Sequence, residues 1–334
     1  MKQNIIKQHD IKNIELVLPN FNLDYTQEFP ELNSKQIKRI KDNLGFSRHY
    51  ICNQDTYASD LAAEALKNIF KNFDPKKLDA LIVISPSPDF LAPPMSFIIH
   101  KKLNLSNDLI MIDRFGFCAS VIQGIFEGFS LLNNKNLNNV IVVYTSAISK
   151  KIKDKNFFMY SSDSASAILI TKSKMSNKCM YVEQNFSDHT LKETLPMTGY
   201  KNGIDELKID NNIFFSFVQD KLPIFFNDIT SNQIKPDFYL LHSPNKFTYS
   251  QLISKLNIDK NKIPNAFAFE NFGFLNANSI MFDLFLNQHL LGNNLLMMSQ
   301  GASISLSAIF LKIQKNTKIN LNFFNPEEKD EKNK

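Results

Sequence analysis

A cysteine and a histidine follow two apolar runs of the chain, where side chains of these types can carry out nucleophilic chemistry. Cys118 lies in DRFGFCASVIQGIFEGF, residues 113–129, between a strand-like run and an amphipathic helix. His242 lies in KPDFYLLHSPN, residues 235–245. The free amides and the dipole at a helix N-terminus favour a thiolate. A neighbouring imidazole can favour it further or donate a hydrogen bond to a substrate.

Both residues also have ordinary structural explanations. A single cysteine beside Phe-Gly-Phe is more commonly a small buried hydrophobe. A histidine that closes a strand is more commonly a structural polar group. Cys52 and Cys179 have no comparable context, and we interpret them as structural. The three cysteines form neither a metal-ligand pair nor a disulfide framework, so we predict no metal site and a reducing compartment.

The segments that must position these residues alternate between strand-like and helix-like patterns. This order predicts an α/β protein in which helices cover the faces of the sheet. Ser59 is the expected cap of the first predicted helix. The predicted strands and helices lie at 59–73 (helix), 79–90 (strand), 95–105 (helix), 108–113 (strand), 119–132 (helix) and 138–147 (strand).

The second part of the chain repeats this plan. FGFCASVIQG at 115–124 is echoed by FGFLNANSIM at 272–281, and NNVIVVYTS at 138–146 by NNLLMMSQG at 293–301. The preceding Ser-Pro lies 30 residues before Phe-Gly-Phe in one copy and 29 in the other. We therefore predict two duplicated halves whose ligand-binding loops face each other, since ligands bind beyond the carboxyl ends of strands in such sheets. The predicted units are an N-terminal half at 1–178 with the cysteine, a C-terminal half at 179–324 with the histidine, and a charged tail at 325–334.

Composition excludes several classes of function. A chain of 334 residues is long enough for two domains or two fused halves. The net charge of +5 is modest, and the lysines are scattered among acidic and amide residues, so no nucleic-acid partner is expected. Charges interrupt the opening MKQNIIKQHDIK, and no apolar run approaches the length of a membrane span. We expect a cytoplasmic protein without a membrane segment.

Taken together, the motifs resemble β-ketoacyl-acyl-carrier-protein synthase III, a member of the thiolase-like condensing enzymes. The resemblance runs from about Leu44 to Leu311. It implies a thiolase-like, five-layered αβαβα fold of two duplicated halves, and a homodimer. The segments that carry it are GFSRHY, TYASDLAAEAL, ISPSPDFLAPPMSFIIHKKLNL, IDRFGFCAS, SSDSASAIL, HSPN and MSQGASISLSA.

The chemistry that this resemblance implies starts with acyl transfer from acyl-CoA to Cys118. A malonyl group on the phosphopantetheine of an acyl carrier protein is then decarboxylated, and its carbanion attacks the acyl-enzyme, in fatty-acid or specialised acyl biosynthesis. By position, His242 stabilises the enolate and Gly301 lies in the loop of the acyl oxyanion hole. Arg48 and Asn245 match positions near the coenzyme A or pantetheine channel. No permanently bound cofactor is expected.

The chain departs from the family where the family has a third catalytic residue, an asparagine. Phe274 occupies that position and cannot donate a hydrogen bond. Asn271 and Asn276 lie close enough in sequence to be candidates for replacing it. Serines also stand where the family has glycines, which predicts a reshaped channel and closing loop. These serines are Ser162, Ser164, Ser166 and Ser303.

Two further functions stay open beside the condensing reaction. An acyltransferase of the same fold would load Cys118 and pass the acyl group to a hydroxyl or amine without decarboxylation, with His242 taking the proton of the acceptor. Phe274 favours this alternative, whereas the breadth of the resemblance favours condensation. The third is a non-catalytic partner subunit, against which the retained cysteine and histidine argue.

Overall fold

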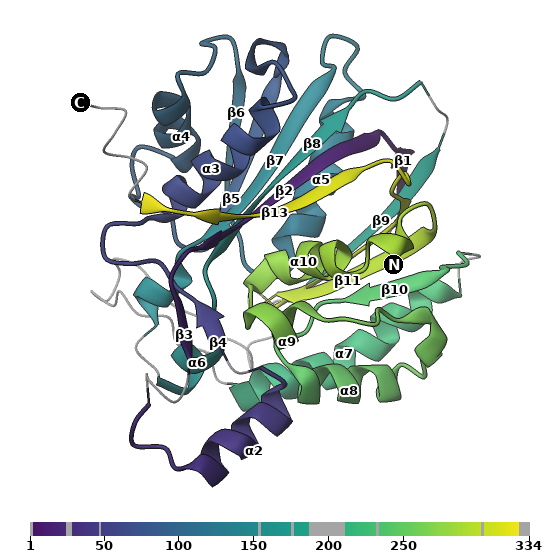
Figure 1. Cartoon of the computed structure of the whole chain (residues 1–334). Coiled ribbons are helices and arrows are strands. Elements are labelled where there is room, and N and C mark those ends of the chain that lie inside the picture. Colours follow the sequence, from purple (N-terminus) through teal and green to yellow (C-terminus); the bar gives the residue numbers. More distant parts are fainter. Residues whose placement is uncertain are drawn as a thin grey trace.

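The structure is a computed structural model, and it describes residues 3–24, 29–46, 48–152, 155–174, 177–186, 211–231, 234–301 and 304–326. Two large β-sheets and three layers of helices make up these residues (Figure 1). The predicted five-layered αβαβα arrangement is confirmed. Ser303 and residues 327–334 of the predicted tail lie outside the described residues.

The larger sheet has six strands in the order β13-β2-β8-β7-β5-β6. β5 pairs in parallel with both β6 and β7, and β7 pairs antiparallel with β8. β6 therefore forms one edge of this sheet. The strands are β2 (Asp10–Pro19), β5 (Ala80–Ser85), β6 (Ile110–Phe115), β7 (Asn139–Ser146), β8 (Ser164–Thr171) and β13 (Lys318–Phe324).

The second sheet has five strands in the order β1-β9-β12-β11-β10, and β3 and β4 form a separate pair. β10 runs parallel to β11, and β11 antiparallel to β12. The strands are β1 (Asn4–Lys7), β9 (Lys178–Asn185), β10 (Phe238–Leu241), β11 (Asn294–Gly301), β12 (Ser305–Lys312), β3 (Asn22–Asp24) and β4 (Arg48–Tyr50).

Helices fill three layers. α3 and α4 pack on the outer face of the six-stranded sheet, α5 and α10 lie between the sheets, and α7 and α8 cover the outer face of the five-stranded sheet (Figure 1). The helices are α2 (Ser34–Leu44), α3 (Ala58–Phe70), α4 (Met95–Leu103), α5 (Ser120–Leu131), α6 (Lys155–Tyr160), α7 (Asn211–Thr230), α8 (Lys246–Lys255), α9 (Ala268–Phe272) and α10 (Ser279–Leu286). Single 3-10 turns lie at Pro75–Lys77, Ile148–Lys151, Lys260–Lys262, Asn276–Asn278 (η6) and Gln288–Leu290.

The internal repeat of the sequence appears in the topology. In each sheet a short strand, β5 or β10, pairs in parallel with the strand from the repeated Asn-Asn motif, β7 or β11. The helix that follows each Phe-Gly-Phe, α5 or α10, enters the layer between the sheets. Each terminal strand joins the sheet of the other half. The N-terminal β1 pairs with β9 in the five-stranded sheet, and the C-terminal β13 pairs with β2 in the six-stranded sheet.

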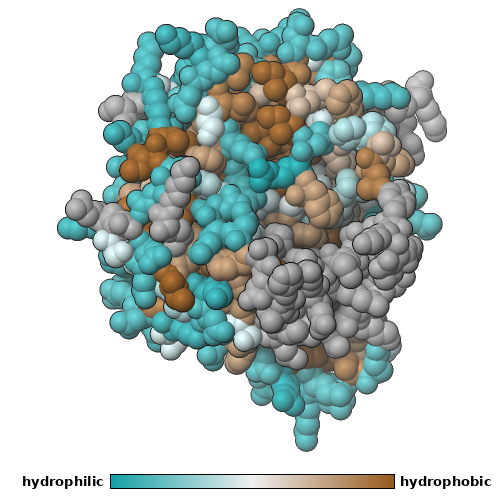
Figure 2. All heavy atoms as spheres, turned by 180° about the vertical axis from the view of Figure 1, so that it is seen from behind, coloured by the Kyte–Doolittle hydropathy of each residue, from teal (hydrophilic) through white to brown (hydrophobic). Residues whose placement is uncertain are grey.

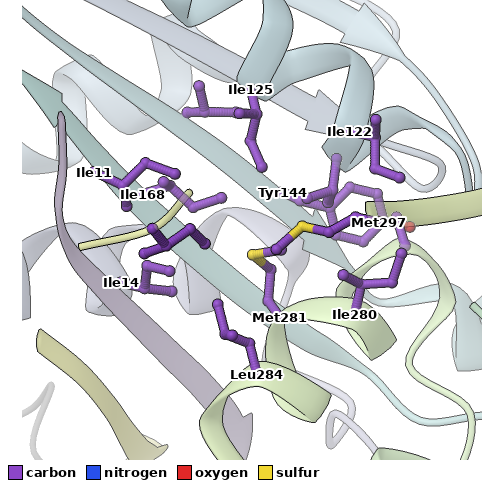
Figure 3. Packing of buried hydrophobic residues seen from close by; sticks show 14 of the residues in the cluster. Ile11, Ile14, Ile122, Ile125, Tyr144, Ile168, Ile280, Met281, Leu284 and Met297 are labelled. Carbon is purple, nitrogen blue, oxygen red and sulfur yellow. The ribbon is translucent and has the colours of Figure 1, made fainter. Parts of the chain in front are cut away.

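The central core holds the two middle helices against both sheets. Ile14 of β2, Ile125 of α5, Met281 of α10 and Met297 of β11 are fully buried and converge in this layer (Figure 3). Burial of side chains of this size stabilises the fold by about 1.5–3 kcal/mol each. The core therefore fixes the starts of α5 and α10, which carry the repeated Phe-Gly-Phe loops.

The predicted cap of the first helix is wrong. α3 begins at Ala58 with Tyr57 as its N-cap residue, and the Asp60 carboxylate accepts a 3.0 Å hydrogen bond from the Tyr57 backbone N–H. Ser59 lies inside the helix, where its hydroxyl accepts a 2.6 Å hydrogen bond from Lys102. The Asp60 carboxylate thus satisfies a backbone amide at the start of the helix.

The outer surface is mixed in character. On the face seen in Figure 2, hydrophobic side chains gather in separate patches between hydrophilic ones. Across the described ranges, no helix combines the length and the hydropathy needed to cross a bilayer.

Candidate active site

Cys118 lies in the turn between β6 and α5, two residues before the helix begins, and is 8% exposed. The turn is tight at Gly116, where a Cβ atom would lie 2.5 Å from the Cβ of Ser120. The Ser120 hydroxyl donates to the Phe117 carbonyl and closes the turn. The glycine therefore allows the close approach that brings the cysteine to the start of the helix.

His242 directly follows β10 and extends its pairing with β11, since its backbone N–H donates a 2.9 Å hydrogen bond to the Met298 carbonyl. The Gln300 side chain donates a 2.9 Å hydrogen bond to the His242 carbonyl. Burial lowers the pKa of the imidazole to about 4, and a contact with the Asn276 backbone opposes this change only in part. The side chain is therefore neutral at pH 7.

β11 connects the two candidate residues. Met298 accepts the His242 backbone hydrogen bond, and the hydroxyl of the next residue, Ser299, donates a 2.7 Å hydrogen bond to the Cys118 carbonyl. One strand of the C-terminal half thus holds both loops. The convergence of the Cys118 and His242 side chains stays a prediction, and these two adjacent strand residues, which bond to both backbones, are consistent with it.

Phe274 packs against both candidate residues. It shares a small buried cluster with Phe117, Cys118 and Ile148. Its ring also meets the His242 imidazole edge-to-face, with 5.6 Å between the ring centroids. The backbone of Phe274 is fixed on both sides, as it donates to the Tyr160 carbonyl at 2.7 Å and accepts from the Ser162 amide at 2.8 Å. The phenyl ring is a rigid apolar wall of the site.

Three of the serines that replace family glycines fasten the segment around Phe274. The Ser162 hydroxyl donates to the Phe272 carbonyl. The Asn278 side chain accepts a 2.6 Å hydrogen bond from Ser166 and donates a 2.9 Å hydrogen bond to Ser164. Each hydroxyl thus meets a polar partner from the C-terminal half, which explains how these serines are buried.

The two asparagines considered as replacements for the family residue lie in different environments. The Asn271 amide donates a 3.0 Å hydrogen bond to the Phe267 carbonyl on the exposed side of α9. Asn276 begins η6, is 3% exposed and has a left-handed backbone with φ of +52°. Its Nδ2 is buried and has no hydrogen-bond partner among the described residues. Asn276 lies at the site, whereas the Asn271 side chain is used on the outside of α9.

The remaining predicted residues lie on elements that border the site. Gly301 ends β11, and its carbonyl accepts a 2.9 Å hydrogen bond from the Ile304 amide, so the strand turns there. Arg48 is exposed at the start of β4, which packs near α9. The Asn245 side chain caps α8 by accepting a 2.9 Å hydrogen bond from the Thr248 amide. This cap is a structural use of Asn245 that the sequence motif did not predict.

Sequence reasoning missed two residues beside the cysteine. Tyr144 of β7 is fully buried, and burial together with the neighbouring Cys118 thiol raises the pKa of its hydroxyl. Ser299 holds the Cys118 carbonyl. Their positions in the repeated strands, NNVIVVYTS and NNLLMMSQG, are the signal that could have identified them.

The described residues contain no group of three or more histidine, cysteine, aspartate or glutamate side chains that could hold a metal ion. The polar groups at the site are a thiol, an imidazole, hydroxyls and an amide. Such groups can form a thioester and donate hydrogen bonds to a developing oxyanion.

Comparisons with known proteins agree with this arrangement. A 3-oxoacyl-acyl-carrier-protein synthase 3 of Campylobacter jejuni is 28% identical over 275 residues, covering 74% of this chain and 76% of that protein. A β-ketoacyl-acyl-carrier-protein synthase III of Clostridium perfringens is 24% identical over 86% of this chain and 93% of its own length. No protein-family model matches the chain.

The fold agrees as well. The crystal structure of a 3-oxoacyl-acyl-carrier-protein synthase from Burkholderia xenovorans superposes with a TM-score of 0.88 at 17% identity, covering 97% of this chain and 99% of that one. The relatives in sequence and the structural neighbour agree with the duplicated topology. The chain is similar in sequence to β-ketoacyl-acyl-carrier-protein synthases III and has the fold of a solved 3-oxoacyl-acyl-carrier-protein synthase.

Proposed function

We propose that this protein condenses an acyl group from acyl-CoA with a malonyl thioester on an acyl carrier protein. The observation that carries the proposal is the fixation of Cys118 and His242 by adjacent residues of β11. The sequence relatives, which are named for this reaction, support it further. Nothing in the comparisons favours transfer to a hydroxyl or amine acceptor.

The first half-reaction acylates Cys118. Its thiolate attacks the carbonyl carbon of acyl-CoA, the carbon–sulfur bond to coenzyme A breaks, and coenzyme A leaves as a thiolate that takes up a proton. Negative charge develops on the carbonyl oxygen during the attack. A backbone N–H at the end of β11, near Gly301, is the proposed donor to this oxygen.

The second half-reaction requires a hydrogen-bond donor that carries no charge of its own. Because burial lowers the pKa of His242 to about 4, its imidazole holds one ring proton and can donate it in a hydrogen bond at pH 7. A donor of this kind stabilises the enolate that forms when malonyl loses carbon dioxide. His242 is the proposed stabiliser of that enolate.

Arg48 and Asn245 are the proposed contacts of the coenzyme A or phosphopantetheine arm. Arg48 is exposed on β4, and a guanidinium is suited to phosphate groups. Asn245 follows His242 by three residues and lies at the start of α8. A substrate arm that passes between these elements would reach the cysteine from the side of His242.

A homodimer is part of the proposal. β6 is an edge strand of the six-stranded sheet and exposes Ile110 and Phe115 at its two ends. Exposed apolar side chains on an unpaired edge favour pairing with another strand. The same strand leads into the Cys118 turn, so a partner at this edge would lie near the site.

Two measurements test the proposal. Incubation with acyl-CoA should raise the intact mass of the protein by one acyl group, and Cys118→Ala should abolish the increase. The acylated protein should then release carbon dioxide from malonyl carrier protein. Acylation without this release, combined with discharge of the thioester by hydroxyl or amine acceptors, would replace condensation with transfer.

A further inference from the structure

In the proposed condensation a negative charge develops on the thioester oxygen, and His242 is its proposed hydrogen-bond donor. When malonyl loses carbon dioxide, the electron pair of the broken carbon–carbon bond moves onto the thioester oxygen. His242 can donate one hydrogen bond to this oxygen. Phe274, whose ring lies against the imidazole, has no donor. A second donor must come from another residue if the oxygen is to be held as an enolate.

Three asparagine side chains lie on the segment around Phe274, and two of them are already used. Asn271 donates to the Phe267 carbonyl on the exposed side of α9. Asn278 is bound by Ser164 and Ser166 in the buried contact between the halves. The Nδ2 of Asn276 is buried and has no partner within the described part of the chain. Buried amides are nearly always hydrogen-bonded, so this free one is available to a ligand.

The backbone of Asn276 lies against the His242 imidazole. Asn276 adopts a φ of +52°, a left-handed conformation that asparagine, aspartate and glycine tolerate better than other residues. Its backbone contacts the His242 imidazole, and η6 packs against α5, which follows Cys118. Neither His242 ring nitrogen makes a well-formed hydrogen bond to a described residue. Two buried residues with unused polar atoms are thus neighbours in the structure.

We propose that the Asn276 side-chain amide is the second hydrogen-bond donor to the malonyl thioester oxygen, beside His242. This inference rests on the proposed condensation. The bond between the carboxyl carbon and the α-carbon breaks, carbon dioxide leaves, and the enolate oxygen accepts one hydrogen bond from each residue. The α-carbon then bonds to the acyl carbonyl carbon, and the Cys118 sulfur leaves as a thiolate. Asn276 is therefore a catalytic residue for decarboxylation and has no part in acyl loading.

The test separates decarboxylation from loading in two variants. Asn276→Gly keeps the left-handed backbone and removes the amide. Asn276→Ala also removes the amide and keeps the Cβ. Asn271→Ala is the matched control on the outside of α9. Loading is followed by the intact mass of the acylated protein, and decarboxylation by carbon dioxide release from malonyl carrier protein.

Both Asn276 variants should melt near the wild-type temperature and load Cys118 at rates within about twofold of wild type. Their carbon dioxide release should fall by about two to three orders of magnitude, the usual effect of removing one oxyanion donor. Asn271→Ala should release carbon dioxide at the wild-type rate. The double variant Phe274→Asn/Asn276→Gly should recover part of the loss, because it places an amide at the position of the Phe274 ring, against His242.

The role of Asn276 alone would be overturned if Asn276→Gly and Asn276→Ala fold, load Cys118 and release carbon dioxide within about threefold of the wild-type rate. A wild-type protein that loads Cys118 and releases no carbon dioxide would overturn the condensing function, and the role of Asn276 with it. The two failures are therefore distinguishable in the same set of measurements.

Discussion

The state of His242 yields a prediction about stability as well as catalysis. Its pKa is about 4 in the folded protein, whereas the ordinary value is 6.5. Between these two pH values the unfolded chain binds a proton that the folded protein does not. Stability therefore falls as the pH falls through this window. The gap corresponds to about 3 kcal/mol of unfolding free energy, lost between about pH 7 and pH 4.

The assay compares wild type with His242→Gln, which is polar, similar in size and does not titrate. Urea unfolding at several pH values gives the unfolding free energy of each protein. Other buried titrating groups, such as Asp163 and Asp283, are shared and cancel in the difference. The unfolding free energy of wild type minus that of His242→Gln should fall by about 3 kcal/mol from pH 7 to pH 4. A difference that stays constant or grows on acidification would refute a buried, neutral His242.

The same reasoning applies to catalysis. After Cys118 is acylated its thiol no longer titrates, so His242 is the group at the site whose protonation controls decarboxylation. The rate of carbon dioxide release should therefore be level from about pH 5.5 to pH 8, since the imidazole is neutral throughout. A sharp fall below pH 6.5 would show a histidine with an ordinary pKa.

Three further predictions concern the core, the cysteine turn and the sheet edge. Burial raises the pKa of Asp283 to about 7, above its ordinary 3.8. The stability that the protonated carboxyl contributes is therefore lost as the pH rises through 7. Asp283→Asn should raise the melting temperature at pH 8 more than at pH 5. Gly116→Ala places a Cβ 2.5 Å from the Cβ of Ser120. It should lower the unfolding free energy by about 1–3 kcal/mol and slow acyl loading of Cys118. Unchanged stability and loading would contradict the tight turn. Light scattering should give twice the 38.4 kDa chain mass for wild type and a single-chain mass for Ile110→Lys, whereas a dimeric Ile110→Lys would exclude pairing through β6.

The sequence predicted the parts of the fold that repeat within it. The apolar runs at 138–147 and 293–301 became β7 and β11, and the two Phe-Gly-Phe motifs lead into α5 and α10. These predictions succeeded because periodicity and turn residues are local signals. The pairing of β1 with β9 and of β13 with β2 could not be predicted, since no local sequence pattern determines which distant strand each of them pairs with.

The sequence motifs named the members of the candidate site, and the structure supplies their environments. The motif match placed Phe274 at the position of the family's third catalytic residue, and in the structure its ring lies against His242. The local pattern could not show that Asn271 bonds within its helix while Asn276 is buried in a left-handed turn. These differences arise from tertiary packing, as does the choice of Asp60 over Ser59 at the start of α3.

The condensing function itself is tested most directly by the product left on the carrier. Wild-type protein given acyl-CoA and malonyl carrier protein should produce a 3-oxoacyl carrier protein. The mass of the carrier should show that its malonyl group has lost carbon dioxide and gained the acyl group. Cys118→Ala should yield none of this 3-oxoacyl product. A wild-type reaction that consumes acyl-CoA, releases no carbon dioxide and leaves malonyl carrier protein unchanged would contradict the account.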